Sequence, residues 1–180
     1  MLGKNSIADS AFIKSSLNFE YTPVSCQISP AEVASTSRVE IDSSYIFYGY
    51  QDPQYVDAGG LSITIKGYPL EILVRVTDTV FFKNHGRRGG NMAVYVLETS
   101  AELDRRITVL VENCSFVKGS AHEGGGLALF VEGQCDNTVD LQTSTFLQVS
   151  SSYFLLNHAT TNESKCEDCY CGLGGGVYIT

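Results

Sequence analysis

The segment Cys166-Glu-Asp-Cys-Tyr-Cys171 holds the densest group of chemically reactive side chains in the sequence. Three soft sulfur ligands so close together could bind zinc or carry out thiol exchange. A structural zinc site needs a fourth ligand, and His158 is the only nearby candidate. Disulfide bonds are the simpler interpretation, and we predict no metal site. The disulfide candidates are Cys135, Cys166, Cys169 and Cys171, in a pairing that the sequence leaves open.

A second group of chemically capable residues is His85-Gly-Arg-Arg88, where a titratable imidazole lies beside two cations. The carboxylate of a polysaccharide could dock on such a loop. The segment 35 residues later, Ser120-Ala-His-Glu123, lacks both arginines, so a solvated loop is the simpler interpretation. Residues 48–54 faintly resemble the Asp-Pro-His motif of alginate epimerases. Gln54 stands where the catalytic histidine would be, which favours a turn.

Paired carboxylates are the third kind of chemistry to consider. Acid–base cleavage of a glycosidic bond uses two carboxyl groups about 5–9.5 Å apart. In a repeat protein this requires Asp or Glu to recur at one position of the repeat. The predicted equivalents of Asp78 are Asn113 and Thr143, and those of Glu112 are also uncharged, so no acidic row results. We therefore predict no catalytic residues, no cofactor and no enzymatic activity.

Composition limits the partners. The chain has 43% apolar residues and a net charge of -8, with twenty carboxylates against twelve Lys and Arg, which excludes a basic nucleic-acid-binding stripe. The longest apolar runs, such as residues 127–131, are far shorter than the roughly 20 residues that cross a bilayer. We predict attachment to a membrane only through parts outside this chain.

Two tripeptides match the acceptor pattern for N-glycosylation, at Asn113 and Asn162. This pattern has a physical meaning only in the secretory pathway, where disulfides also form. Together with the six cysteines, it predicts an extracellular or cell-surface location. The first twelve residues lack the apolar core of a signal peptide.

An internal repeat organises the sequence. Residues 72–96 align with residues 107–131 without a gap, at an offset of 35 residues, and nine of the 25 positions are identical. Alternating apolar residues, as in Leu127, Leu129 and Val131, predict strands and no helix. One repeat buries too little apolar surface to offset the conformational entropy of ordering it, so the repeats must stack on one another.

Stacking predicts an all-β fold, a right-handed parallel β-helix in which each repeat forms one coil of a solenoid. Five phenylalanines mark about five coils of roughly 30–35 residues: Phe12, Phe47, Phe81, Phe116 and Phe146. We predict one domain over residues 1–180, with an insertion loop at residues 147–173. Thr180 ends a predicted strand without a polar cap, so we expect the chain to be a fragment of a longer solenoid.

Equivalent residues of neighbouring coils should form rows. The predicted inward rows are Leu61, Met92, Leu127 and Val177; Ile63, Val94, Leu129 and Ile179; and Phe81, Phe116 and Phe146. The predicted outward row is Thr64, Tyr95, Phe130 and Tyr178. Tyr95, Phe130 and Tyr178 are therefore the candidate ligand-binding residues, because exposed rings in a row can pack on sugars or on a partner's apolar patch. The same rings could instead shield one another beneath the loops.

Glycine-pair strands (GGNMAVYV, GGGLALFV and GGGVYIT) and the turn Phe81-Phe-Lys-Asn84 form a recognisable combination. This combination resembles the polymorphic outer-membrane-protein repeat of chlamydiae and the pectin-lyase-like β-helix repeats of predicted eukaryotic surface proteins. The resemblance covers roughly residues 9–180, although Gly119, Val149 and Ser15 stand where the other repeats would carry the Asn. It implies a passive or adhesive function at a surface.

The predicted function is that of a non-enzymatic structural or adhesive segment of an extracellular repeat protein, which binds glycans or surface proteins. The alternative is the non-catalytic part of a polysaccharide-active β-helix enzyme whose catalytic coils lie elsewhere.

Overall fold

In the computed structural model the chain is all-β, and every described strand pair is parallel. The structure describes residues 5–7, 18–20, 24–28, 36–49, 58–66, 71–97, 105–132, 143–159 and 175–179. Within these ranges, no helix has the length and apolar character needed to span a membrane.

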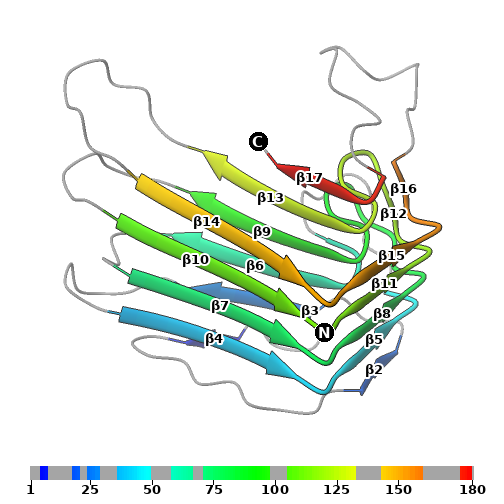
Figure 1. Ribbon diagram of the computed structural model, residues 1–180, viewed down its shortest axis with the longest axis horizontal. Helices are drawn as coiled ribbons and strands as arrows, with labels where there is room; N and C mark the ends of the chain where they lie inside the picture. The colour runs from blue at the N-terminus through cyan, green and yellow to red at the C-terminus, as the bar shows by residue number, and fades with distance from the viewer. Residues whose placement is uncertain are drawn as a thin grey trace.

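Three larger sheets and one small sheet contain the described strands (Figure 1). The six-stranded sheet has the order β1 (Asn5–Ile7), β3 (Val24–Ile28), β6 (Leu61–Lys66), β9 (Met92–Leu97), β13 (Leu127–Glu132) and β17 (Val177–Ile179). The four-stranded sheet has the order β14 (Thr143–Ser150), β10 (Arg105–Glu112), β7 (Glu71–Thr77) and β4 (Thr36–Asp42). The five-stranded sheet has the order β15 (Tyr153–Leu155), β11 (Ser115–Val117), β8 (Val80–Phe82), β5 (Tyr45–Phe47) and β2 (Asn18–Glu20). β12 (Ser120–Ala121) pairs with β16 (His158–Ala159).

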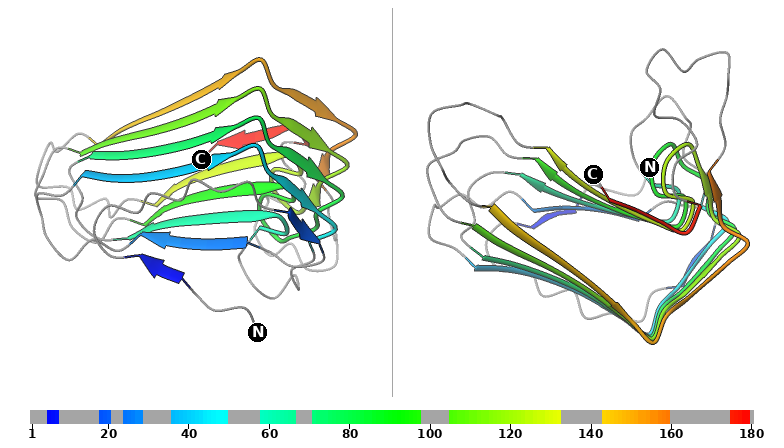
Figure 2. Two further views of the ribbon diagram at one scale, coloured as in Figure 1. Left: turned by 90° about the horizontal axis from the view of Figure 1, so that it is seen from below. Right: turned by 45° about the horizontal axis from the view of Figure 1, so that its top comes forward.

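Successive repeats pass through the three larger sheets in a fixed order. β7, β8 and β9 follow one another along the chain and lie in the four-, five- and six-stranded sheets, and β10, β11 and β13 repeat this order. The strands of the two best-matched repeats are offset by 35 residues, as in the pairing of Leu127 with Met92 and of Phe116 with Phe81, whereas Leu61 and Met92 pair at an offset of 31 residues. Figure 2 shows the larger sheets as three walls around one interior. The predicted parallel pairing is confirmed, and so is the register between residues 72–96 and 107–131.

One hydrophobic core receives side chains from all three larger sheets, because alternate residues of each strand point inward. Val39, Val74 and Val109 form an inward row of the four-stranded sheet and are fully buried. The two inward rows predicted for the six-stranded sheet, which begin at Leu61 and Ile63, are present in the predicted register. Each row thus packs one repeat on the next.

The phenylalanine row differs from the prediction in its last member. Phe81 and Phe116 stack with ring centroids 4.8 Å apart, and Phe154 stacks on Phe116 at 4.7 Å. Ile46 occupies the equivalent inward position in β5. Phe146 was a wrong member, because it lies in β14 of the four-stranded sheet, where it pairs with Thr108. Phe47, which was expected to mark a coil, pairs with Phe82 and lies one residue out of register with Phe81, and a one-residue shift turns a side chain to the other face. Phe12 lies outside the described residues.

The predicted insertion at residues 147–173 begins too early. The last part of β14, all of β15 and β16 lie inside that range and continue the repeat. The error has the same cause as the misplaced Phe146: the last repeat is offset by 38 residues, as between Gly119 and Asn157, instead of 35. Residues 160–174 lie outside the described part of the chain.

Two corners in each repeat place a non-glycine residue in the left-handed region of backbone conformation. One corner precedes the five-stranded sheet, with Ser43, Asp78, Asn113 and Ser151 at φ 47–52°. The other follows it, with Tyr48, Lys83, Lys118 and Leu156 at φ 54–56°. The backbone N–H of each corner residue in one repeat donates to the next repeat, as from Lys83 to the Val117 carbonyl at 2.9 Å. These bonds offset the steric cost of the left-handed conformation.

Beyond the second corner, asparagine and glycine alternate from repeat to repeat. The Asn84 side chain accepts from the Gly49 N–H at 2.8 Å, and Asn157 accepts from the Gly119 N–H at the same distance. Asn91 joins the two amides: Asn84 donates to it at 2.9 Å, and it donates to Asn157 at 3.0 Å. Phe154-Leu-Leu-Asn157 is therefore a second Phe-x-x-Asn turn, which the sequence alignment misplaced.

We expect Phe116→Ala to destabilise the protein by about 3–5 kcal/mol, because it removes the fully buried middle ring of the stack and leaves a cavity. Phe146→Ala is the matched control, since Phe146 is 54% exposed, and its effect should stay within about 0.5 kcal/mol. Urea denaturation followed by circular dichroism measures both. Equal losses for the two variants would contradict the register described above.

Candidate binding surfaces

The predicted exposed aromatic row is buried, and the expectation of an exposed surface there was wrong. Tyr95 is 4% exposed and Phe130 is 2% exposed, and their rings stack 5.1 Å apart. The loop that carries Arg88 covers them: its guanidinium lies 4.7 Å from the Phe130 ring centroid, and its carbonyl accepts from the Tyr95 hydroxyl. Tyr178 pairs with Ala128 instead of Phe130 and is partly buried. The alternative interpretation, rings beneath loops, is the correct one.

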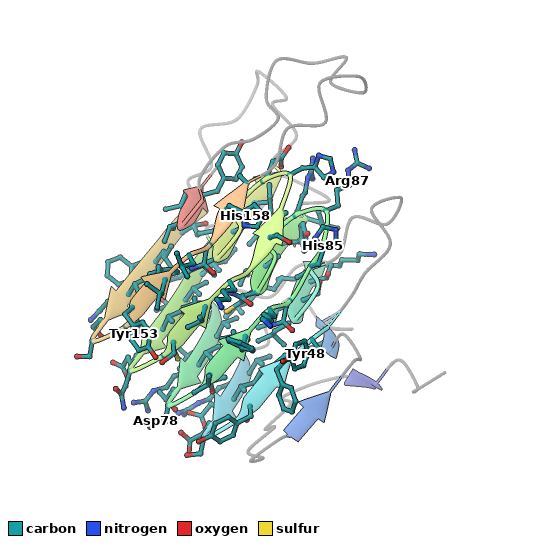
Figure 3. All side chains as sticks on the ribbon, turned by 90° about the vertical axis from the view of Figure 1, so that its right-hand side faces the viewer. Tyr48, Asp78, His85, Arg87, Tyr153 and His158 are labelled. Carbon is teal, nitrogen blue, oxygen red and sulfur yellow. The ribbon has the colours of Figure 1, made fainter. Side chains whose placement is uncertain are left out.

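The exposed aromatic residues lie instead on the outer face of the five-stranded sheet. We call this surface the aromatic face; it comprises Tyr45, Phe47, Tyr48, Val80, Phe82, Val117, Tyr153, Leu155 and Leu156, together with Lys83 and Lys118. Tyr45 and Tyr153 are 57% and 55% exposed, and Leu156 is 65% exposed. Figure 3 looks onto this face, with Tyr48 and Tyr153 labelled. The sequence did not predict this face, because the rows were assigned from one phenylalanine in each repeat and not from the residues beside it.

Rings and lysines of the aromatic face contact one another. The Tyr48 ring lies edge-on to Phe82 at 5.8 Å. The Lys83 ammonium lies 5.4 Å from the Tyr48 ring centroid and 5.2 Å from that of Phe82, and the Lys118 ammonium approaches Phe82 to 5.9 Å. Such cation–π contacts hold the amino groups over the rings. The face therefore offers apolar area and positive charge together.

All three histidines of the chain gather at the far end of the five-stranded sheet. We call the group of His85, Arg87, His122 and His158 the histidine corner. The backbone of Ser120 bridges to that of His85 and pairs with that of His158, and the Arg87 carbonyl accepts from the His122 N–H at 2.9 Å. Figure 3 shows His85, Arg87 and His158 at the end of the sheet opposite Asp78. The repeat thus brings His158, which the sequence suggested only as a zinc ligand, to the end of the row of His85 and Ser120.

The local electrostatics of the histidine corner favour neutral imidazole at His85. Burial lowers the pKa of His85, and the nearby charges of His122 and His158 lower this pKa further. Its Nδ1 lies 2.6 Å from the Ser120 hydroxyl. Arg88 is neutralised by Glu123, at 3.1 Å from its Nε to the carboxylate.

A groove of about 350 Å³ lies at the opposite corner, lined by Glu40, Asp42, Arg75, Thr77, Asp78, Glu112 and Asn113. Asp42 and Glu112 flank Thr77 in one row, so an acidic pair that the sequence alignment missed is present. The Thr77 hydroxyl donates to Asp42, and Arg75 pairs with Glu112 at 2.8 Å. The equivalent of Asp78 in the last repeat is Ser151 and not Thr143 as predicted.

The remaining predicted sites divide into described and undescribed residues. Asn113 is an exposed corner residue whose side-chain amide donates to Asp78. Asn162 and the four disulfide candidates, Cys135, Cys166, Cys169 and Cys171, lie outside the described residues. Cys26 and Cys114, which are described, are free and buried. In the described ranges, no group of three or more His, Cys, Asp or Glu residues could hold a metal ion.

Comparison of the chain with family models, with curated proteins and with solved structures found no match.

We expect Cys26 and Cys114 to resist alkylation in the native protein and to react after unfolding. Both thiols are buried, and burial raises the pKa of Cys26 and raises the pKa of Cys114 to about 11, so little reactive thiolate exists at pH 8. Iodoacetamide labelling with site-resolved mass spectrometry, before and after guanidinium treatment, measures this. Cys114→Ser should fold normally, because Ser44 and Ser152 make the equivalent contact to the carbonyl two residues earlier. Rapid native labelling of Cys114 would contradict its burial.

We expect acidification to destabilise the wild type more than His85→Gln. The pKa of His85 is lower in the folded state than in the unfolded state, so the unfolded chain takes up the proton first. The stability contributed by neutral His85 is complete above a pH of about 6.5 and is lost as the pH falls below it. Urea midpoints at pH 7.0 and 5.0 measure the effect. The same decrease in both proteins would show that His85 is not the titrating group.

Proposed function

We propose that the chain is a segment of a right-handed parallel β-helix. Three observations support this: consecutive repeats visit the three larger sheets in one order, all strand pairs described are parallel, and the sheets share one core. Crossovers between parallel strands of one sheet are right-handed in nearly all proteins, which supports the handedness. Each repeat would then be one coil, and the outward side chains would form continuous rows along the solenoid.

The proposed function is non-enzymatic binding at an extracellular or cell surface, as a structural or adhesive segment. The observation that carries it is the aromatic face. A soluble protein rarely exposes Tyr45, Tyr153, Leu155 and Leu156 together on one sheet unless a ligand covers them. The exposed acceptor Asn113 supports passage through the secretory pathway.

Glycans are the ligands we favour over protein partners. Neighbouring strands of a sheet lie about 4.8 Å apart, so rings from several repeats lie along one flat surface. Flat rings can pack on the apolar faces of sugar units. The two lysines add donors for hydroxyl oxygens at the same surface.

A second candidate function is supported by the groove between Asp42 and Glu112. Four carboxylates and one arginine line it, which is the kind of residue set that polysaccharide-active proteins place around a sugar chain. Under this alternative, the described repeats would be the non-catalytic part of such an enzyme.

We expect the double variant Tyr45→Ser/Tyr153→Ser to lose glycan binding by about tenfold or more, because each stacked ring contributes about 0.5–1.5 kcal/mol beyond its area. Phe146→Ser is the matched control, since Phe146 is equally exposed but lies on the four-stranded sheet. A glycan array identifies the ligand, and calorimetry with the best ligand compares the three proteins.

Two outcomes would contradict this proposal. Unchanged binding in the double variant would exclude the aromatic face as the binding surface. Release of reducing ends from a polysaccharide, abolished by Asp42→Asn, would show that the protein is an enzyme and that the groove is its active site.

A further inference from the structure

We infer that the histidine corner is a binding site for an oxyanion, that is, for a sulfate, phosphate or carboxylate group. This inference concerns a different surface from the aromatic face and stands without it. It rests on four cationic or ionisable side chains that the repeat brings to one corner: His85, Arg87, His122 and His158.

The backbone register explains why these residues meet. Ser120 lies beside His85 at an offset of 35 residues, and His158 continues the same row through the pairing of β12 with β16. His122 lies beside Arg87, because its N–H donates to the Arg87 carbonyl. Residues of three successive repeats therefore lie side by side at the end of the five-stranded sheet.

Among the residues that the structure describes, the charge at this corner is unbalanced. Glu123, the carboxylate of this loop, is already paired with Arg88. Arg87 is exposed and forms no ion pair with any residue that the structure describes. Protonation of the imidazoles would add further positive charge, and after burial the charges of His122 and His158 are what lowers the pKa of His85. An anion placed among them would relieve the repulsion between these charges.

The size of the site favours an oxyanion over a metal ion. Histidine nitrogens must lie about 2.0–2.1 Å from a zinc ion. The imidazoles do not approach closely enough, since the described residues contain no cluster suited to a metal. An oxyanion can be held by donors that are further apart, because each donor lies about 2.7–2.9 Å from an outer oxygen atom of the anion and not from its central atom. The fork-shaped guanidinium of Arg87 also suits two oxygens of one anion.

The site lies next to the aromatic face. Lys83, Lys118 and Leu156 of that face are each two residues before a member of the row His85, Ser120 and His158. A polymer that carries charged groups could therefore contact both surfaces. The oxyanion could equally be a free ion, and the two sources are separated by experiment.

The test uses the full chain and calorimetric titration with dextran sulfate, carboxymethyl dextran, sodium sulfate and neutral dextran at pH 5.5 and 7.5. We expect at least one anionic probe to bind, about tenfold or more tightly at pH 5.5 than at pH 7.5, because an anion beside an imidazole favours its protonated form. Neutral dextran should not bind at this corner. Binding of sodium sulfate alone would identify a free-ion site, whereas binding of the polymers only would identify a charged polymer as ligand; either supports the oxyanion site.

The decisive variant is Arg87→Gln/His158→Gln, in which both side chains are exposed and their replacement should leave the fold intact. We expect this variant to bind the anionic probes about tenfold or more weakly than the wild type at pH 5.5. Arg106→Gln is the matched control, because Arg106 is an exposed arginine on β10, away from the corner, and it should change the affinity less than twofold. Equal losses in the two variants, or no anion binding at either pH, would overturn the inference. Neither outcome bears on glycan binding at the aromatic face, which Tyr45→Ser/Tyr153→Ser tests separately.

Discussion

The parallel hydrogen-bond register between consecutive repeats is the constraint on which the rest of the structure depends. Because each strand pairs with its counterpart in the next repeat, a residue's nearest neighbours across the sheet are its own equivalents. A side chain that packs well must therefore also pack against its counterparts. The stacked rings of Phe81, Phe116 and Phe154 satisfy this requirement, and the two left-handed corners of every repeat keep successive repeats in step.

The same constraint explains why asparagine follows the second corner only in alternate repeats. A Cβ atom added at Gly119 would lie 2.1 Å from the Gly125 carbonyl oxygen and 2.4 Å from the Asn91 side-chain nitrogen. The glycine leaves the space through which Asn157 reaches the backbone N–H of its neighbour. Asn84 and Gly49 repeat this arrangement. A buried amide that is fully hydrogen-bonded thus requires a residue without a side chain in the adjacent repeat.

The sequence predicted the inward rows of the six-stranded sheet and failed in the last repeat of the five-stranded sheet. The gapless alignment predicted the rows that begin at Leu61 and Ile63, because alternating apolar residues distinguish the two faces of a strand. In the last repeat the offset grows to 38 residues, and Phe146 took the place that belongs to Phe154. The alternation of apolar residues also could not predict the burial of Tyr95, because this burial depends on how the Arg88 loop folds back over the sheet.

Outward positions escape the packing constraint, and this is why the candidate sites lie there. The inward rows must remain apolar in every repeat, whereas the outer faces differ in chemistry: rings and lysines on the five-stranded sheet, imidazoles at one end of it and carboxylates at the other. Each histidine is single within its own repeat, so the segment His85-Gly-Arg-Arg88 marks only one part of the histidine corner. It exists only because stacking converts a separation of 35 residues along the chain into contact between neighbours. In such a protein a functional site is a property of several repeats together, and the register has to be known before it can be found.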